Sequence, residues 1–502
     1  MKKELWNSKR TFILAAVGSA AWLGNLIRFP FQVYENGGAA FLIPYFVILL
    51  IIGLPLLMAE ITLGQKKSAV APNATGKVHP VLKMLGWLMV FSTFVIISYY
   101  SVIIGWLVNY TSFSLSGFLS GTFLWGSDTT SYFYNDFLQL SDGLANKGNL
   151  VHWAFYGTLA VFIALFFALR KWVHSVGKAM TIFAITPFFT LLILLLFSLS
   201  LPGAGQWLEF LVQVDTSKLM KLDTWLAAAG QIFFTLSLAM WVMISYGALK
   251  PKTEEIVKTT GLVVIWNTVI SFLGALTIFA TLGHMAQVSG KDFSEVVKGG
   301  PGLFFEAFPA FFNTLPAEFL IVSVIFFLTV LFLAFTSIIS MCDSVILAIQ
   351  NNCKKISRTT LTIIVLLIGF FASTLYMNQN GLYVLDVVDH YLTTFLIILF
   401  GILELVLFLA ISKKMSHFMS DRSDLPKLFT SVIMLRIFWF ISFVVLSYLM
   451  YLNITWGFWV YDSYLADDMK PYVLGLFGFV WIAALAMSIW TSVYKISEKN
   501  SN

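Results

Sequence analysis

The first apolar segment of the sequence is interrupted by polar and small residues, and it reads Gly18-Ser19-Ala20-Ala21-Trp22-Leu23-Gly24-Asn25-Leu26-Ile27-Arg28-Phe29-Pro30. An Arg at bilayer depth costs at least about 2.5 kcal/mol and usually faces a cavity or a partner. Irregular backbone at that depth is tolerated only where it lines a site or is buried in protein. A kinked packing helix would explain the glycines, but not Asn25 and Arg28 together. The stretch therefore predicts a helix that is broken in mid-membrane and lines a binding site.

The composition is that of a protein that crosses the membrane many times. Of its 502 residues, 59% are hydrophobic and only 11% are charged, whereas soluble proteins carry roughly 25% charged residues. The net charge of +6 follows the membrane topology and does not indicate nucleic acid. The only cysteines, Cys342 and Cys353, give no sign of a disulfide, a metal site or a redox motif. We expect no cleaved signal peptide, because the first apolar run ends without a suitable cleavage site.

Apolar segments of spanning length number about twelve, at about 20 residues each. They lie near 11–34, 39–63, 85–112, 150–170, 178–200, 225–249, 258–283, 317–350, 359–377, 384–411, 429–452 and 472–495. Lys and Arg concentrate in alternate connections, and the other connections are mixed or acidic. The positive-inside rule then predicts a multi-pass protein of the cell membrane with both termini in the cytoplasm.

Two of the outer loops are longer than a connection requires. Residues 113–149 are polar and aromatic, and residues 284–316 mix phenylalanines with glycine turns. The apolar content of 284–316 favours a lid that enters an outer vestibule over a plain connector.

Polar residues within the helices cluster in few places. Segment six reads Gln231-Ile232-Phe233-Phe234-Thr235-Leu236-Ser237-Leu238-Ala239-Met240. Asn267 and Ser271 are four residues apart, so they share one face of segment seven. Segments one and six, five helices apart, are both interrupted by polar sequence, and such a pair of broken helices points to a midplane site in transporters.

These residues resemble the neurotransmitter:sodium symporter family, which has the LeuT-type fold, and the short loops are typical of a bacterial-like member. The resemblance covers nearly the whole chain and rests on five blocks in order: 24–30 (Gly-Asn-Leu-Ile-Arg-Phe-Pro), 35–45 (Glu-Asn-Gly-Gly-Ala-Ala-Phe-Leu-Ile-Pro-Tyr), 231–237 (Gln-Ile-Phe-Phe-Thr-Leu-Ser), 335–337 (Phe-Thr-Ser) and 385–391 (Leu-Asp-Val-Val-Asp-His-Tyr). It implies one all-α transporter domain over 1–502. Within it, the resemblance implies two inverted five-helix repeats at 11–200 and 225–411, followed by two accessory helices at 429–495.

The resemblance also implies two sodium sites. Site 2 would use backbone carbonyls and two hydroxyls, from Gly18, Ala21, Leu333, Thr336 and Ser337. Site 1 would use Ala20, Asn25, Thr235 and Asn267. Oxygen ligands from unwound carbonyls suit a small hard cation.

A chloride site beside sodium site 1 is implied by the same resemblance, with Tyr45, Gln231, Thr235, Asn267 and Ser271. Chloride-independent relatives place a carboxylate at the position of Ser271. The neutral residue here leaves sodium charge uncompensated, so we expect chloride to assist transport. The alternative is that Ser271 is a structural hydroxyl and the charge is balanced elsewhere.

For the substrate, the resemblance implies an outer gate of Tyr100 and Phe234, with Arg28 paired to Asp389 above it. A partner for a buried Arg is expected on physical grounds as well. Residues that would contact the substrate are Ala20, Trp22, Leu23, Gly24, Ile96, Tyr100, Phe234, Ser237, Met240, Ile338 and Met341. The mostly apolar walls suit an apolar or aromatic group.

The sequence departs from the family pattern at Trp22, where amino-acid transporters have Gly and monoamine transporters have Asp. Three interpretations remain open. The indole stacks on a substrate that lacks a carboxylate, with a cation–π contact of ~0.5–2 kcal/mol; it points into the scaffold and leaves an ordinary amino-acid site; or it occludes the site. The inner gate also departs, with Lys3 and Asn351 where relatives pair Arg with Asp, and Ala239 replaces a usual Gly.

The leading hypothesis is a sodium-coupled symporter of a small organic substrate, namely an apolar or aromatic amino acid or a related amine or indole compound. The alternative is a substrate-binding sensor with little net transport. An enzyme is disfavoured, because catalytic metal, phosphate-loop and triad motifs are not found in the sequence. We expect no nucleic-acid partner and no obligatory protein partner.

Overall fold

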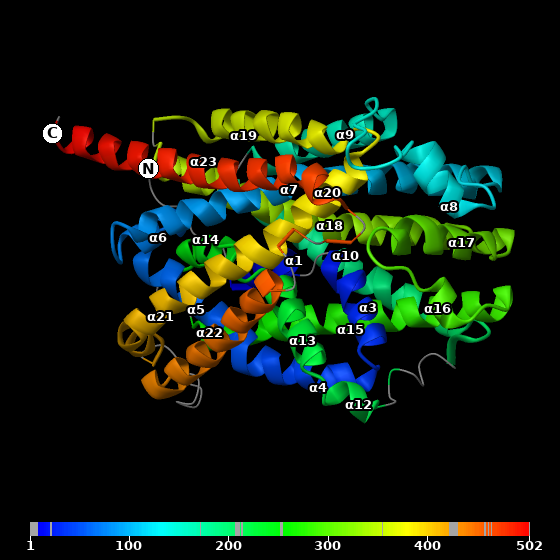
Figure 1. The fold of residues 1–502 in the computed structure, drawn as a ribbon, viewed down its shortest axis with the longest axis horizontal. Helices are drawn as coiled ribbons and strands as arrows, with labels where there is room; N and C mark the ends of the chain where they lie inside the picture. The colour runs from blue at the N-terminus through cyan, green and yellow to red at the C-terminus, as the bar shows by residue number, and fades with distance from the viewer. Residues whose placement is uncertain are drawn as a thin grey trace.

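The computed structural model describes residues 9–20, 23–170, 172–205, 211, 214–251, 255–353, 355–420, 430–455, 458–459, 461–462 and 464–500. These residues form helices, with isolated β-bridges but no extended strand among them. Figure 1 shows long helices running roughly in one direction, as in a bundle that spans a membrane. The expected all-α membrane fold is therefore confirmed for the described residues.

The helices alternate with short connections along the chain. Their bounds are α1 Lys9–Ala20, α2 Leu23–Leu26, α3 Arg28–Glu35, α4 Ala39–Ile48, η1 Leu49–Gly53, α5 Leu54–Lys67, α6 Ala71–Gly76, α7 Leu82–Ser120, α8 Thr129–Ser131, η2 Tyr132–Phe137, α9 His152–Leu169, α10 Trp172–Leu199, α12 Thr216–Leu219, α13 Leu222–Thr235, α14 Val242–Ala248, α15 Val257–Ser289, α16 Phe293–Val296, η3 Leu303–Ala307, α17 Phe308–Asn313, η4 Ala317–Phe319, α18 Ile321–Gln350, α19 Arg358–Ser373, η5 Thr374–Tyr376, α20 Gly381–Tyr391, η6 Leu392–Leu396, α21 Ile397–Ser420, α22 Val432–Thr455 and α23 Ala466–Asn500.

Ten spans in the described part are long and apolar enough to cross a membrane. They are Ala39–Lys67, Leu82–Ser120, His152–Leu169, Ile182–Leu199, Val257–Ser289, Ala317–Gln350, Arg358–Tyr376, Gly381–Ser420, Val432–Thr455 and Ala466–Ser492. Each coincides with one of the twelve expected segments. The remaining two expected segments, 11–34 and 225–249, are the ones in which the helix is broken.

The first break separates α1 from α2. Arg10–Ala20 and Leu23–Glu35 together are apolar enough to span, but they are bent by 61° relative to each other. Ala21 and Trp22, at the bend, lie outside the described residues. The bend agrees with the interruption predicted from the sequence.

The second break separates α13 from α14. Three residues in this segment, Ser237, Ala239 and Trp241, have left-handed backbone with φ of 51°, 60° and 60°. That conformation costs an L-residue roughly 1–2 kcal/mol, so surrounding contacts must hold it. Ala239 N–H donates to the buried carboxylate of Glu60 at 2.9 Å, and Thr93 Oγ1 donates to the Met240 carbonyl at 3.2 Å.

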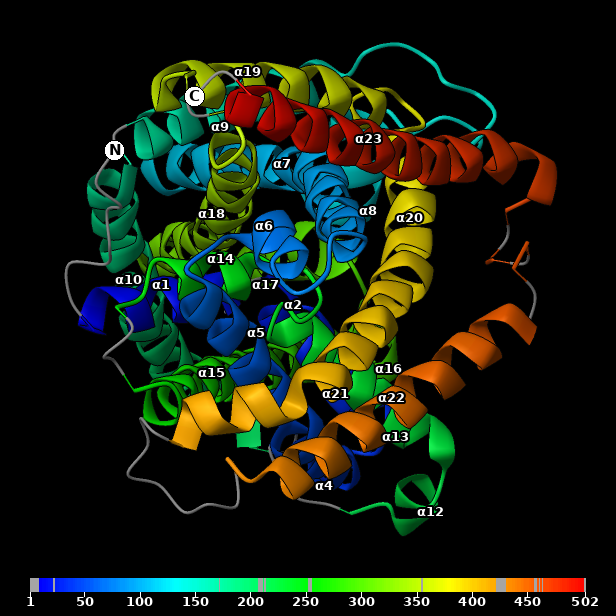
Figure 2. The ribbon, with the colours of Figure 1, turned by 90° about the vertical axis from the view of Figure 1, so that its left-hand side faces the viewer.

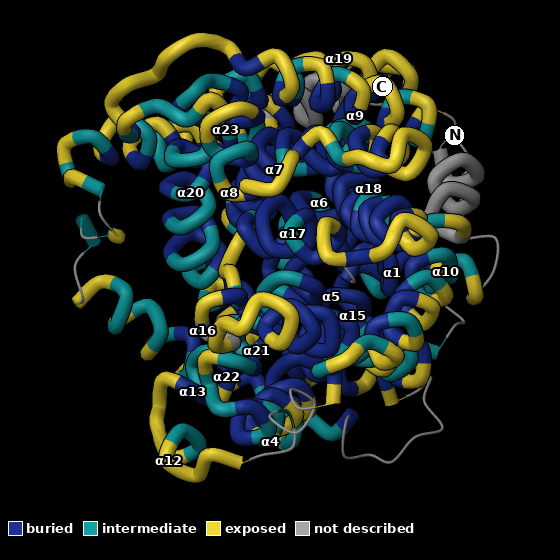
Figure 3. Tube along the Cα trace, turned by 90° about the vertical axis from the view of Figure 1, so that its right-hand side faces the viewer, coloured by how far each residue is buried: buried dark blue, intermediate teal, exposed yellow. Residues whose placement is uncertain are grey.

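The centre of the molecule is formed by helices from both halves of the chain. α7 packs against α18 and α9, and α1 packs against α10, α15 and α18. α5 packs against α14, where close backbone approach leaves no room for a side chain: a Cβ at Gly64 would lie 2.0 Å from the Ile244 carbonyl oxygen. Figure 3 shows α5, α7 and α18 largely buried, whereas α9 and α10 are partly exposed. Both breaks therefore lie in the protein interior, where irregular backbone is tolerated.

The two long loops pack on each other at one end of the bundle. Glu306 in η3 accepts hydrogen bonds from Thr130 Oγ1 at 3.0 Å and from Tyr134 OH at 2.8 Å. In Figure 1, α8 and α17 lie at this end, and α6 and the C-terminal part of α23 lie at the opposite end.

Candidate functional site

Ser19 joins the two broken helices. Its carbonyl accepts a hydrogen bond from Ser237 Oγ at 3.3 Å, and its hydroxyl accepts one from Ser340 Oγ at 2.9 Å. Three segments that are far apart in sequence therefore meet at one residue. Sequence reasoning did not single out Ser19, because a lone Ser in an apolar helix usually bonds only to its own turn.

Four of the six side chains expected around sodium site 1 and chloride form one hydrogen-bonded cluster. Asn25 Nδ2 donates to Asn267 Oδ1 and to Ser271 Oγ, each at 2.8 Å. Thr235 Oγ1 donates to Asn25 Oδ1 at 3.1 Å, and Asn267 Nδ2 donates to Thr235 Oγ1 at 3.0 Å. All four side chains are fully buried. The cluster places neutral oxygen atoms from α2, α13 and α15 beside the first break, next to the buried Ala20.

The residues expected at sodium site 2 lie on α1 and α18. Thr336 Oγ1 donates to the Leu333 carbonyl at 2.7 Å, and Ser337 Oγ lies 3.5 Å from the same oxygen. Gly18 faces them closely, since a Cβ at this position would be 3.1 Å from the Cβ of Thr336. The carbonyl and two hydroxyls therefore converge opposite a residue that has no side chain to fill the space.

Gln231, near the amide cluster, has a buried side-chain amide whose nitrogen and oxygen have no hydrogen-bond partner among the described residues. The buried Tyr45 hydroxyl interacts with the side chains of Thr268 and Ser271, and α13, which carries Gln231, packs against α4, which carries Tyr45. Because an unsatisfied buried polar group costs about 1–3 kcal/mol, the amide N–H of Gln231 fits a ligand that accepts hydrogen bonds.

A cavity of about 280 Å³ lies on the loop side of the first break. Its walls include six of the expected substrate and gate residues, Leu23, Gly24, Arg28, Tyr100, Phe234 and Asp389. Tyr100 lies by the backbone of Leu23 and by Ser337, so the cavity adjoins the proposed sodium site 2. Aromatic rings on two walls suit an apolar or aromatic group.

Arg28 and Asp389 line this cavity, but they are not paired across it. The Arg28 guanidinium lies 5.1 Å from the centre of the Phe234 ring. Asp389 accepts a hydrogen bond from Tyr99 OH at 2.5 Å. The salt bridges found among the described residues do not include Arg28 with Asp389. In this conformation the cavity is therefore not closed by the expected ion pair.

The other expected substrate residues lie deeper or to one side. Met240 lines a second cavity of about 310 Å³, which shares Arg28 and Phe234 with the first. The remaining ones are buried and are not among the residues that line the first cavity: Ala20, Ile96, Ser237, Ile338 and Met341. Trp22 lies outside the described residues.

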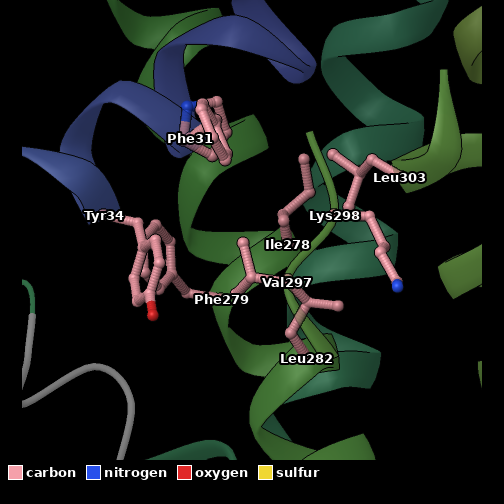
Figure 4. A pocket seen from close by; sticks show the side chains of 9 residues that line it. Phe31, Tyr34, Ile278, Phe279, Leu282, Val297, Lys298 and Leu303 are labelled. Atoms are coloured by element: carbon pink, nitrogen blue, oxygen red, sulfur yellow. The ribbon is translucent and has the colours of Figure 1, made fainter. Parts of the chain in front are cut away.

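The loop expected to form a lid does reach the cavity. Gly300, Pro301 and Phe305 are among the residues that line it. A Cβ at Gly299 would be 3.4 Å from the ring of Phe31, so the loop passes directly over α3. Figure 4 shows Val297, Lys298 and Leu303 facing Phe31, Tyr34 and Phe279 across a narrow crevice.

At the opposite end, a buried ion pair that the sequence did not reveal joins α18 to α19. Arg358 pairs with Asp343, and both side chains are at most 7% exposed. Asn351, expected at the inner gate, follows the last residue of α18. Its expected partner Lys3 lies outside the described residues.

Comparison with known proteins gives a family match over nearly the whole chain. The model of the sodium:neurotransmitter symporter family matches residues 3–127 and 120–498.

Similar proteins include three named transporters. An uncharacterized sodium-dependent transporter of Methanocaldococcus jannaschii is 34% identical over 411 residues, covering 81% of this chain and 82% of the relative. The sodium- and chloride-dependent GABA transporter 2 of Mus musculus is 28% identical, with 80% and 71% covered. The sodium- and chloride-dependent taurine transporter of Rattus norvegicus is 29% identical, with 78% and 68% covered.

Proposed function

The chain belongs to the sodium:neurotransmitter symporter family, and from this premise we propose that it couples sodium entry to the uptake of a small organic substrate at the two broken helices. The observation that carries the proposal is the buried cluster of Asn25, Thr235, Asn267 and Ser271 beside the break between α1 and α2. It brings neutral oxygens from three helices to one point next to a substrate-sized cavity.

For sodium, we propose two sites. Site 2 takes the carbonyls of Gly18, Ala21 and Leu333 with the hydroxyls of Thr336 and Ser337, which supply the oxygen ligands that a hard cation prefers. Site 1 takes the Ala20 carbonyl and the side-chain oxygens of Asn25, Thr235 and Asn267. The convergence of Thr336 and Ser337 on the Leu333 carbonyl supports site 2.

For chloride, we propose a site at Tyr45, Gln231, Thr235, Asn267 and Ser271. The unpartnered amide N–H of Gln231 supports it, because it is a buried donor that an anion would satisfy. Both the GABA and the taurine transporters named above are chloride-dependent by name. The family membership does not by itself require chloride.

For the substrate, we propose an apolar or aromatic amino acid, or a related amine or indole compound. The Tyr100 and Phe234 rings support an apolar group in the cavity. Closure would bring Arg28 to Asp389 and seal the cavity below the loop that carries Gly300 and Pro301. Alternating access would then use the two repeats, 11–200 and 225–411, about the site between them.

The test is uptake into proteoliposomes made with the purified protein and a sodium gradient. Thr336→Ala removes one ligand of site 2, so we expect the sodium concentration for half-maximal uptake to rise at least about tenfold. Thr277→Ala is the matched control, since Thr277 is also buried and likewise donates to a carbonyl of its own helix, that of Leu273, but it is not one of the proposed sodium ligands. Substrate binding without counterflow, or uptake unchanged when sodium is replaced by a larger organic cation, would contradict the proposal.

A further inference from the structure

Four lysines line one small cavity at the end of the molecule opposite α8 and α17. The cavity has a volume of about 90 Å³ and lies between the end of α5, the turn after α6 and the end of α21. Its lysines are Lys66, Lys67, Lys77 and Lys414. Lys67 and Lys77 each donate to the other's backbone carbonyl, at 3.2 and 2.8 Å. Four lysines on its walls make the cavity electropositive, and such a cavity suits an anion.

Backbone and ring contacts hold these lysines in place. Lys66 donates to the Lys414 carbonyl, and its ammonium lies 5.2 Å from the centre of the Phe418 ring. These contacts tie α5 to α21, and the pair Lys67–Lys77 ties α5 to the turn after α6. The cavity is therefore a built feature at the junction of three elements.

A larger apolar groove continues from the lysine cavity, and Val78 lines both. The groove has a volume of about 440 Å³ and runs between the start of α7 and α21. Its walls include Leu85, Leu88 and Leu403. Val81 is 72% exposed and Val406 is 50% exposed at its edge. Exposed apolar surface of this kind is suited to contact with hydrocarbon.

The cavity and the groove lie at different depths of the spanning helices. Lys66 and Lys67 end the span Ala39–Lys67, Lys77 precedes the span Leu82–Ser120, and Lys414 is near the end of the span Gly381–Ser420. The groove residues on α7 and α21 lie within their spans. Figure 2 shows α5, α6 and α21 beside one another at this end. Lysines at a membrane boundary above an apolar groove match the two parts of a phospholipid.

The geometry points to a binding site for an anionic phospholipid of the leaflet on this side. Its phosphate would sit among Lys66, Lys67, Lys77 and Lys414, and an acyl chain would lie along the groove beside Val81 and Val406. The bound lipid would bridge α5, α6, α7 and α21, and binding to the folded state alone raises apparent stability. This site is separate from the proposed sodium and substrate sites.

The experiment titrates phosphatidylglycerol into the full-length protein in dodecyl maltoside and follows the thermal midpoint. Lys77→Gln with Lys414→Gln removes two exposed lysines of the cavity; Lys258→Gln with Lys355→Gln removes two exposed lysines elsewhere. A lysine near the surface contributes about 1 kcal/mol of lipid attraction, so the cavity double variant should bind about thirtyfold more weakly. The control double variant should bind like the parent. Phosphatidylcholine should raise the midpoint much less.

Two further measurements distinguish binding of the whole lipid from binding of its headgroup alone. Glycerol phosphate shares the phosphate but has no acyl chain, so it should give little stabilisation. Val81→Asn with Val406→Asn leaves the lysines intact and should weaken phosphatidylglycerol binding. Equal effects of glycerol phosphate and phosphatidylglycerol, equal losses in both lysine double variants, or parental affinity in the cavity double variant would each overturn the proposal.

Discussion

Single side chains decide how charge is balanced beside the sodium site. Ser271 accepts a hydrogen bond from Asn25 at 2.8 Å and is fully buried. A carboxylate at this position would place a fixed negative charge where chloride is proposed. We therefore predict that Ser271→Glu makes uptake independent of chloride, while the parent loses most of its uptake when chloride is replaced by gluconate.

Ser271→Gln is the matched control for this charge, since glutamine has nearly the same size as glutamate but carries no charge. It should stay chloride-dependent or be inactive. A Ser271→Glu protein that needs chloride as much as the parent would remove the support for the proposed anion site. So would a parent whose uptake does not change in gluconate.

The identity of the substrate depends most on the role of Trp22. By the resemblance, Trp22 stands at the sequence position where amino-acid transporters have Gly and monoamine transporters have Asp. If it contacts the substrate, Trp22→Gly should change the order of preferred ligands more than any other single substitution in the pocket. Thermal-shift profiles of amines, amino acids and indoles, with and without sodium, measure this. An unchanged profile would mean that the indole faces the scaffold.

At this scale the sequence motifs grouped polar residues that lie together in the structure, and their roles as ligands stay predictions. Asn25, Thr235 and Asn267 could be placed at one site from their motifs, and the structure brings them within hydrogen-bonding distance. The conformation of the gate could not be predicted, because the distance between Arg28 and Asp389 depends on the state of the molecule. Ser19 was missed because its role depends on partners more than 200 residues away.

At the scale of the element, the buried side chain of Glu60 helps to hold the break between α13 and α14. Ala239 N–H donates to Glu60 at 2.9 Å, and both groups are buried. Glu60→Leu leaves that N–H without a partner, which costs about 1–3 kcal/mol. We predict a clearly lowered thermal midpoint and loss of uptake. The control Glu60→Gln keeps a side-chain oxygen as acceptor and should fall between Glu60→Leu and the parent.

The left-handed backbone of the same break gives a second prediction. Ala239 has φ of 60°, a conformation that Gly adopts without the cost that an L-residue bears. Ala239→Gly should therefore keep or raise the thermal midpoint, and Ala239→Val should lower it, because a β-branched residue is strained there. If glycine lowered the midpoint as much as valine, the contact of the Ala239 side chain, rather than its backbone, would be what matters.

The elements themselves followed from composition, but their irregularities did not. Apolar length located the spans because a membrane fixes how long an apolar helix must be. The segment from Ser237 to Trp241, in which Ser237, Ala239 and Trp241 are left-handed, contains no glycine. The sequence therefore had no turn-forming residue that would have indicated this conformation. The interruption was visible only as polar residues in an apolar helix.

At the scale of the whole molecule, the distribution of basic loops predicted a two-sided protein. The structure puts α6 and the C-terminal part of α23 at one end of the bundle and α8 and α17 at the other (Figure 1). The alternation of charge is a sum over many loops, so it does not depend on any one of them.

The buried pair of Arg358 with Asp343 was not predicted, because pairing between helices is set by their packing.

The orientation can be tested with single cysteines, since the chain holds only Cys342 and Cys353, both buried. Burial also raises the pKa of the Cys353 thiol, which lowers its reactive thiolate fraction at neutral pH. The parent protein should therefore label weakly.

If the basic loops face the cytoplasm, Lys147→Cys, exposed in the loop before α9, should react with a membrane-impermeant maleimide on intact cells. Lys355→Cys, exposed before α19, should react only after the membrane is permeabilised. The reverse pattern would invert the topology, and it would move the lysine cavity and its proposed lipid to the outer leaflet.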